Sequence, residues 1–229
     1  GAPLMWIGAK SLQPHPSALD AMTETAQTVG RARYGFLTWP KFWLIAIAVT
    51  LLAMTHATLI NHLLLLLKDR QIDAGTAVLA ASFMGPMQVV GRIVATLFER
   101  FVSNAVLMGL CFVFSISAVG ALMLAADMPA MLAVFIILQG SGIGVSSIMK
   151  PVLTREILGG ENFGLKSGAQ AVPFFIGNAF AALIGSLLWS VGGYDLVLKA
   201  LLVLLGVGLI ALLLAIRLNK SGDHQHAQM

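Results

Sequence analysis

The sequence predicts an all-α integral membrane protein, a bundle of six transmembrane helices. Apolar residues make up 58% of the 229 residues and charged residues only 10%, and the mean hydropathy is +0.89. The apolar residues come in long blocks, most of which reach the roughly 20 residues needed to cross about 30 Å of hydrocarbon. Short polar breaks separate the blocks, so the pattern indicates several membrane spans and not one buried core.

Six apolar blocks define the predicted spans, which cover residues 42–67, 74–98, 103–126, 131–149, 167–191 and 194–218. The first span begins beside Trp39, Pro40 and Trp43. Tryptophan side chains suit the interface between membrane and water, which is where the end of a span lies. A polar loop is expected at 150–166, with a small helix that begins at Pro151. The glycine pair 192–193 is expected to turn the fifth span into the sixth.

The charged residues indicate how the chain lies in the membrane. With both termini in the cytoplasm, ten of the 14 lysines and arginines lie on the inner side, and only Lys68 and Arg70 lie in outer loops. We therefore expect a cytoplasmic linker at 1–41, a membrane domain at 42–218 and a cytoplasmic tail at 219–229. We expect the protein to lie in a plasma membrane, namely the inner membrane of a bacterium.

Polar side chains within the spans are the candidates for a solute pathway, because they usually face the bundle interior or a water-filled cavity. His56 and His62, which cannot share one helix face, can bind a solute or carry a proton, or can be neutral and hydrogen-bonded to a neighbouring helix. The other candidates are amides: Asn61, Gln88, Gln139, Gln170 and Asn178. The glycines 140, 142 and 144 that follow Gln139 favour close helix packing.

A charged motif closes the second span. Gly91-Arg92 is followed by Glu99-Arg100, and Arg92 is seven residues from Glu99, two turns along the same helix face. We interpret these four residues as a structural or gating motif, with direct contact of Arg92 to an anionic solute as the alternative.

This motif resembles the loop between the eighth and ninth helices of major facilitator superfamily transporters, although Glu99 stands where that family usually has Asp. Two further stretches are similar to the same family: residues 155–164, which match the loop before its eleventh helix, and residues 185–194, with their Gly-Gly-Tyr turn. Together the matches cover roughly 42–218. The resemblance implies that this chain is the carboxy-terminal half of a twelve-helix carrier whose amino-terminal half is missing here.

The resemblance also implies a function: secondary active transport of a small solute by alternating access, without a cofactor. Halves of such carriers are built from two inverted three-helix repeats. In this chain Pro86 is followed by Gly91-Arg92 and Pro173 by Gly177-Asn178, so the two middle helices share a pattern. We expect both prolines to bend their helices.

Other classes of protein fit less well. The chain is not expected to be an enzyme, because Ser141 lacks the Gly-x-Ser-Gly spacing of a rhomboid-like protease and no HExxH zinc motif is present. Two tail histidines, His224 and His226, are too few to predict a metal site. The basic residues lie at the ends of the apolar blocks, so nucleic acid is not an expected partner. A six-helix scaffold or an oligomeric channel subunit remains the alternative to a carrier.

Overall fold

The computed structural model describes residues 34–226, with side chains up to residue 220. The chain divides into two units, Gly1–Trp39 and Pro40–Met229. In the first unit the described residues form the short 3₁₀ helix η1 (Gly35–Thr38). Most of the predicted linker at 1–41 therefore lies outside the described residues.

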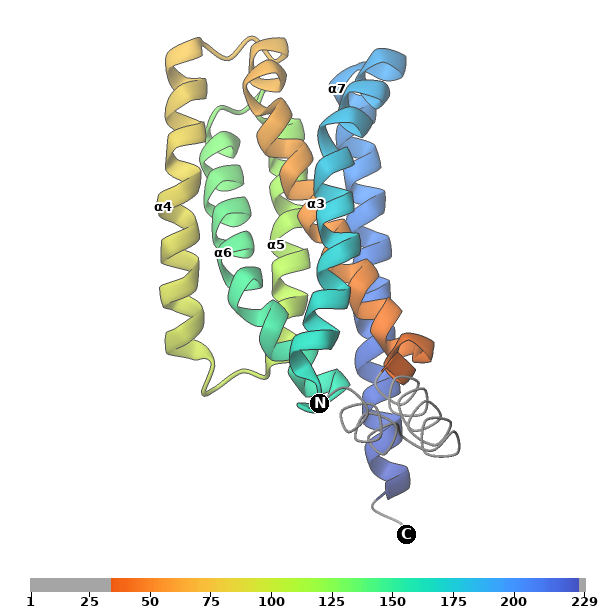
Figure 1. Cartoon of the computed structure of the whole chain (residues 1–229). Coiled ribbons are helices and arrows are strands. Elements are labelled where there is room, and N and C mark those ends of the chain that lie inside the picture. The colour runs from red at the N-terminus through yellow and green to blue at the C-terminus, as the bar shows by residue number, and fades with distance from the viewer. Residues whose placement is uncertain (1–33, 227–229) are drawn as a thin grey trace, which may run out of the picture. The chain divides into compact units, whose positions relative to one another are not determined.

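The second unit is entirely helical in its described part (Figure 1). Its helices are α3 (Pro40–Asp69), α4 (Ala74–Phe98), α5 (Asn104–Leu124), α6 (Ala130–Leu158) and α7 (Phe163–His226). Each of these five helices is long and apolar enough to cross a membrane. The protein is therefore a helical membrane protein.

The longest helix, α7, is broken at the predicted glycine turn. Gly192 and Gly193 have non-helical dihedral angles, with φ 65° and ψ −169° at Gly193. That conformation is essentially restricted to glycine, because a Cβ atom would clash with the backbone. Figure 1 shows the first arm of α7 (163–191) and the second arm (194–226) running in opposite directions. The second arm continues as a helix through 219–226, where the sequence predicted a tail.

The loop predicted at 150–166 is too long, because only residues 159–162 connect α6 to α7. The helix expected from Pro151 to the glycines at 159–160 is present and ends at Leu158, but it continues α6 and is not a separate element. A proline inside a helix removes one backbone hydrogen bond, and neighbouring packing can offset that loss. Here the packing continues across the proline, since buried apolar residues recur every four positions: Met149, Leu153 and Ile157. This apolar stripe keeps the last two turns of α6 against the bundle.

The helices differ in how deeply they are packed. The main contacts join α3 to α7, α5 to α6, and α4 to α6. Only 22% of the most apolar stretch of α4 is buried, compared with 50% in α3 and in α5. Figure 1 accordingly shows α4 at one edge of the bundle, beside α6. Pro86 and Pro173 lie inside α4 and α7.

Glycines bring α4 and α6 into backbone contact. A Cβ atom added to Gly144 would lie 2.1 Å from the carbonyl oxygen of Gln88, and one added to Gly91 would lie 2.4 Å from that of Ser141. Gly140, one turn before Gly144, would place its Cβ 2.5 Å from that of Met87. Small residues four apart let membrane helices approach in this way. The predicted packing role of the α6 glycines agrees with this contact.

Candidate functional site

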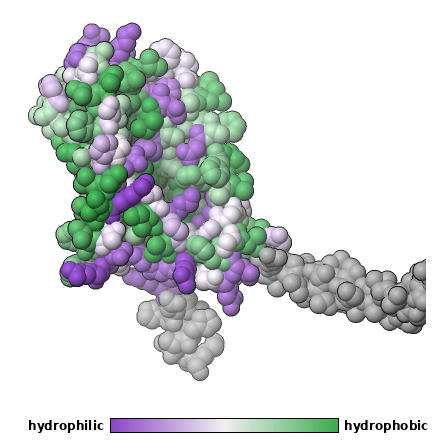
Figure 2. Space-filling view, turned by 60° about the vertical axis from the view of Figure 1, so that its left-hand side comes forward, coloured by the Kyte–Doolittle hydropathy of each residue, from purple (hydrophilic) through white to green (hydrophobic). Residues whose placement is uncertain are grey.

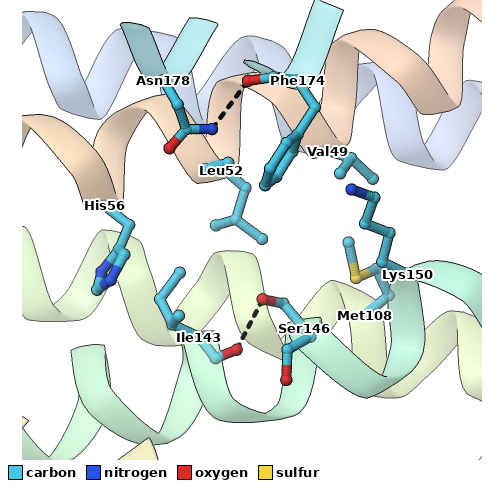
Figure 3. Close-up of a pocket in the computed structure, with 11 residues that line it drawn as sticks. Val49, Leu52, His56, Met108, Ile143, Ser146, Lys150, Phe174 and Asn178 are labelled. Atoms are coloured by element: carbon cyan, nitrogen blue, oxygen red, sulfur yellow. Dashed lines mark hydrogen bonds between the residues drawn. The ribbon is translucent and has the colours of Figure 1, made fainter. Parts of the chain in front are cut away.

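A cavity of about 270 Å³ lies among α3, α5, α6 and α7. Its lining is mixed in character (Figure 3). The apolar lining residues are Val49, Leu52, Ala53, Met108, Ile143 and Phe174, and the polar ones, which lie at several positions around the cavity, are His56, Ser146, Ser147, Lys150 and Asn178. Pockets for drug-sized ligands typically measure about 300–1,000 Å³, so this cavity suits a small molecule.

His56 is held at the cavity by a buried amide. Nε2 of Gln139, on α6, lies 3.4 Å from Nδ1 of His56, on α3, and the side chain of Gln139 is fully buried. When the amide donates to Nδ1, a neutral imidazole carries its proton on Nε2, which is then a donor. The predicted candidates His56 and Gln139 therefore act as one unit, with Gln139 positioning the ring.

Lys150 is a cavity residue that the sequence analysis missed. Its side chain extends from α6 toward α7, where Nζ lies 3.6 Å from the centroid of the Phe174 ring (Figure 3). We had placed Lys150 in the loop predicted at 150–166, whereas it lies on the continuous helix α6. The four-residue spacing of Met149, Leu153 and Ile157 was the available signal, because it extends the helix past Lys150.

The remaining polar groups of the cavity are bound to their own helices. Nδ2 of Asn178 donates to the carbonyl oxygen of Phe174 at 2.8 Å. The hydroxyls of Ser146 and Ser147 donate to Ile143 and Gly144, at 2.9 and 2.7 Å. Each serine hydroxyl uses its one proton in this bond, so its oxygen is left to accept, whereas Asn178 keeps a second N–H donor as well as its amide oxygen. Asn178 is thus the third predicted candidate at this cavity.

His62 and Asn61 lie away from the cavity. Nε2 of His62 is 3.1 Å from the carbonyl oxygen of Ala182 on α7, and its ring centroid is 6.1 Å from that of Tyr194. Asn61 is exposed and donates to the carbonyl oxygen of Ala57 in its own helix at 2.8 Å. For His62 the geometry fits the second interpretation of the sequence, a histidine bonded to a neighbouring helix.

The other two amide candidates are also separate from the cavity lining. Gln170 is buried on α7, and its side-chain amide lies 2.8 Å from the hydroxyl of Thr154 on α6. Gln88 is half-buried on α4, with its backbone carbonyl against Gly144. These two residues contribute to helix contacts in the described bundle.

Arg92, Glu99 and Arg100 lie on the exposed surface of the bundle at α4 and its end. Among residues 34–220, the ion pair described joins Arg70 to Asp195. Arg92, Glu99 and Arg100 form no ion pair within this part of the chain. Arg100 lies 4.6 Å from the centroid of the Phe101 ring. The gating role of this motif therefore stays a prediction, one that depends on what covers α4.

No cluster of three or more metal-binding side chains occurs among the residues whose side chains are described. The side chains of His224 and His226 lie outside that range. Comparison with protein-family models gives no match, and no curated protein matches the sequence.

Proposed function

We propose that this chain is the carboxy-terminal half of a twelve-helix secondary transporter similar to the major facilitator superfamily. In this proposal it moves a small solute by alternating access, rocking against an amino-terminal half. The main support is the cavity, which has five polar lining residues although it lies among helices suited to a membrane. Polar groups inside a membrane cost free energy, and they usually mark the path of a solute or ion.

The proposal requires six membrane crossings from five helices. The apolar part of α7 has 58 residues, which would measure about 87 Å as one straight helix. The hydrocarbon core is only about 30 Å thick. The break at Gly192 and Gly193 resolves this mismatch if each arm of α7 crosses once. An even number of crossings then allows both ends of the bundle to be cytoplasmic in a bacterial plasma membrane, as the charge distribution favours.

The exposed apolar surfaces of the bundle support the proposal that a second, amino-terminal half of the carrier packs against it. Large apolar side chains are exposed along α4 and the first arm of α7, among them Leu79, Phe83, Ile93, Phe175, Phe180 and Leu187. Figure 2 shows a face on which apolar residues dominate the middle while hydrophilic residues gather toward the two ends. Lipid alone could cover these residues. However, Arg92 is also exposed on α4, and a charge facing lipid is costly unless it reaches the interface.

The direct test begins with the coding DNA upstream of the Gly1 codon. We expect the reading frame to continue into six further apolar blocks. The complete gene product, reconstituted in proteoliposomes, should then exchange labelled solute across the bilayer. Arg92→Ala should slow exchange at least tenfold without reducing membrane insertion, and Lys199→Gln, at another exposed cation, serves as the control. A start codon just before Gly1, or exchange that is unchanged in Arg92→Ala, would argue against the proposal or the gating role respectively.

The alternative is a six-helix scaffold or a channel subunit. The exposed face of α4 suits oligomer contacts as well as it suits a second half. Ion conductance across a planar bilayer, in steps that persist without any exchangeable solute, would favour the channel. A protein that forms defined oligomers but neither conducts ions nor exchanges solutes would favour the scaffold.

A further inference from the structure

We infer that the cavity binds a small organic carboxylate and that Lys150 recognises its anionic group. The inference deepens the proposed function and rests on it only in treating the carboxylate as the transported solute. Binding itself can be measured independently of transport.

The charges that line the cavity favour an anionic ligand. Lys150 is the one lysine, arginine, aspartate or glutamate among the residues that line the cavity. Within the described part of the bundle no carboxylate forms an ion pair with it, and its ammonium group faces the Phe174 ring instead. Lys150 is half-buried, so part of its hydration is lost, and a cation–π contact compensates for a lost hydration shell less well than an opposite charge does. A bound carboxylate would offset more of that loss than the ring does.

The Lys150 side chain is directed at the cavity lining and not along its own helix. A lysine near the end of a membrane helix usually extends along the helix surface so that its ammonium group reaches the lipid headgroups. Here the side chain crosses from α6 to α7 and ends over Phe174 at 3.6 Å, on the lining of the cavity (Figure 3). The ammonium group is therefore placed where a solute in the cavity can contact it.

The rest of the lining fits a carboxylate that has a short apolar body. His56 lies at the opposite end of the cavity from Lys150 in Figure 3, with Leu52 and Ile143 between them. A carboxylate with a short apolar body would place its anionic group at Lys150 and its body against the apolar side chains. A second polar group on the ligand would meet the ring of His56. The absence of acidic lining residues disfavours a cationic solute.

The experiment is a thermal-shift assay on the complete gene product in detergent at constant ionic strength. The probes are acetate, butyrate and benzoate, each compared with its uncharged amide: acetamide, butyramide and benzamide. A ligand that binds only the folded state raises the unfolding midpoint, and the shift grows with the logarithm of the ligand concentration once this exceeds the dissociation constant. We expect at least one acid to raise the midpoint and its amide to raise it by less than a fifth as much.

Two variants assign the effect to the cavity. Lys150→Gln should abolish the acid-dependent shift, and Lys150→Arg, which keeps the charge, should retain part of it. If Lys150→Gln does not fold, Lys150→Met provides a second test, because an apolar side chain of similar length is tolerated in a membrane helix. Lys199→Gln is the matched control for loss of one positive charge.

The inference is overturned if none of the three acids shifts the midpoint of the native protein, or if the shift survives in Lys150→Gln. An acid-dependent shift without any solute exchange would support the binding site and contradict the proposed carrier. Exchange of uncharged solutes without an acid-dependent shift would support the carrier and contradict the carboxylate site.

Discussion

The contact between α4 and α6 differs from the contact between α3 and α7 in what opposes each glycine. In the first, the atoms nearest to Gly144 and Gly91 belong to the backbones of Gln88 and Ser141. In the second, Gly177 and Gly185 face the side chains of Thr50 and His62. Of these two contacts, only the second is crossed by side-chain hydrogen bonds in the described bundle. His62 bonds to Ala182 at 3.1 Å, and the Thr58 hydroxyl shares its proton between Met54 in its own helix, at 2.9 Å, and Ala181 on α7, at 3.2 Å.

The difference teaches that a glycine can serve two purposes in membrane helix packing. Between α4 and α6 it lets two backbones meet, and a backbone carbonyl cannot move without moving its helix. Between α3 and α7 it makes room for polar side chains that reach a carbonyl of the opposite helix. The same substitution should therefore cost different amounts at the two contacts. Cys111, the single cysteine of the chain, is buried and reports unfolding by becoming reactive to a fluorogenic thiol dye.

The largest effect is expected for Gly144→Ala. The new Cβ atom would lie 2.1 Å from the carbonyl oxygen of Gln88, so α4 and α6 must separate. We expect a loss of about 3 kcal/mol, at the upper end of typical overpacking costs. The measurement is thermal unfolding followed at Cys111. Gly206→Ala is the matched control, because a Cβ atom there meets no heavy atom within 4 Å, and it should leave stability unchanged or slightly raised.

A smaller effect is expected for Gly185→Ala. Its Cβ atom would lie 2.5 Å from Nε2 of His62, a side-chain ring that can rotate away while giving up its bond to Ala182. We expect a loss of about 1–2 kcal/mol. The same change in a His62→Ala background should cost much less, because the opposing ring is gone. Strictly additive costs in this double-mutant cycle would contradict the described contact.

A still smaller effect is expected for Thr58→Val, which removes a hydroxyl but keeps the shape of the side chain. Hydrogen bonds between membrane helices contribute about 0.6 kcal/mol on average, so a loss of that size is expected. Thr55→Val on the same helix is the control. The Thr55 hydroxyl is buried without a hydrogen-bond partner, so its removal should be neutral or stabilising. Equal losses in the two variants would show that Thr58 forms no useful bond to α7.

The smallest effect is expected for Asp195→Asn, which removes the ion pair between Arg70 and α7. The side chain of Asp195 is 64% exposed, and surface ion pairs contribute about 0–1 kcal/mol. We expect a change below about 0.5 kcal/mol, and one that decreases further as salt is raised from low to physiological concentration. A loss comparable to that of Gly185→Ala would contradict this ranking and would mean that the ion pair contributes as much to the contact between α3 and α7 as the close approach at Gly185 does.

Hydropathy predicted the helices well where an apolar block ends in charged or turn residues. The second block was predicted at 74–98, which are the bounds of α4, and the glycine pair 192–193 is where α7 breaks. A charged residue changes the solvation of the chain at its own position, and a glycine changes the dihedral angles allowed there. Both effects are local, so they can be predicted from the sequence alone. The apolar stripe of α6 beyond Pro151 was missed because a lysine and a proline together resemble the start of a new helix.

The candidate site was only partly predictable. Polar residues inside apolar blocks pointed to His56, Gln139 and Asn178. In the structure His56 and Asn178 line the cavity, and Gln139 lies behind His56, 3.4 Å from its ring. The same rule also selected His62, Gln170 and Asn61, which lie elsewhere. The sequence pattern shows on which face of its own helix a residue lies. It does not show which neighbouring helix that face contacts. Lys150 was missed for a different reason. It falls in the loop predicted at 150–166, where its side chain would face solvent.

The glycine pair in α7 has a mechanical consequence. From the last residue of the first arm to the first residue of the second there are three Cα–Cα steps of about 3.8 Å, so the link reaches about 11 Å at full extension, little more than the roughly 8–10 Å between packed helices. Sliding one arm past the other by a helical turn of about 5.4 Å would extend Gly192 and Gly193 almost fully. The link therefore limits how far the first arm, which carries Phe174 and Asn178, can slide along the second.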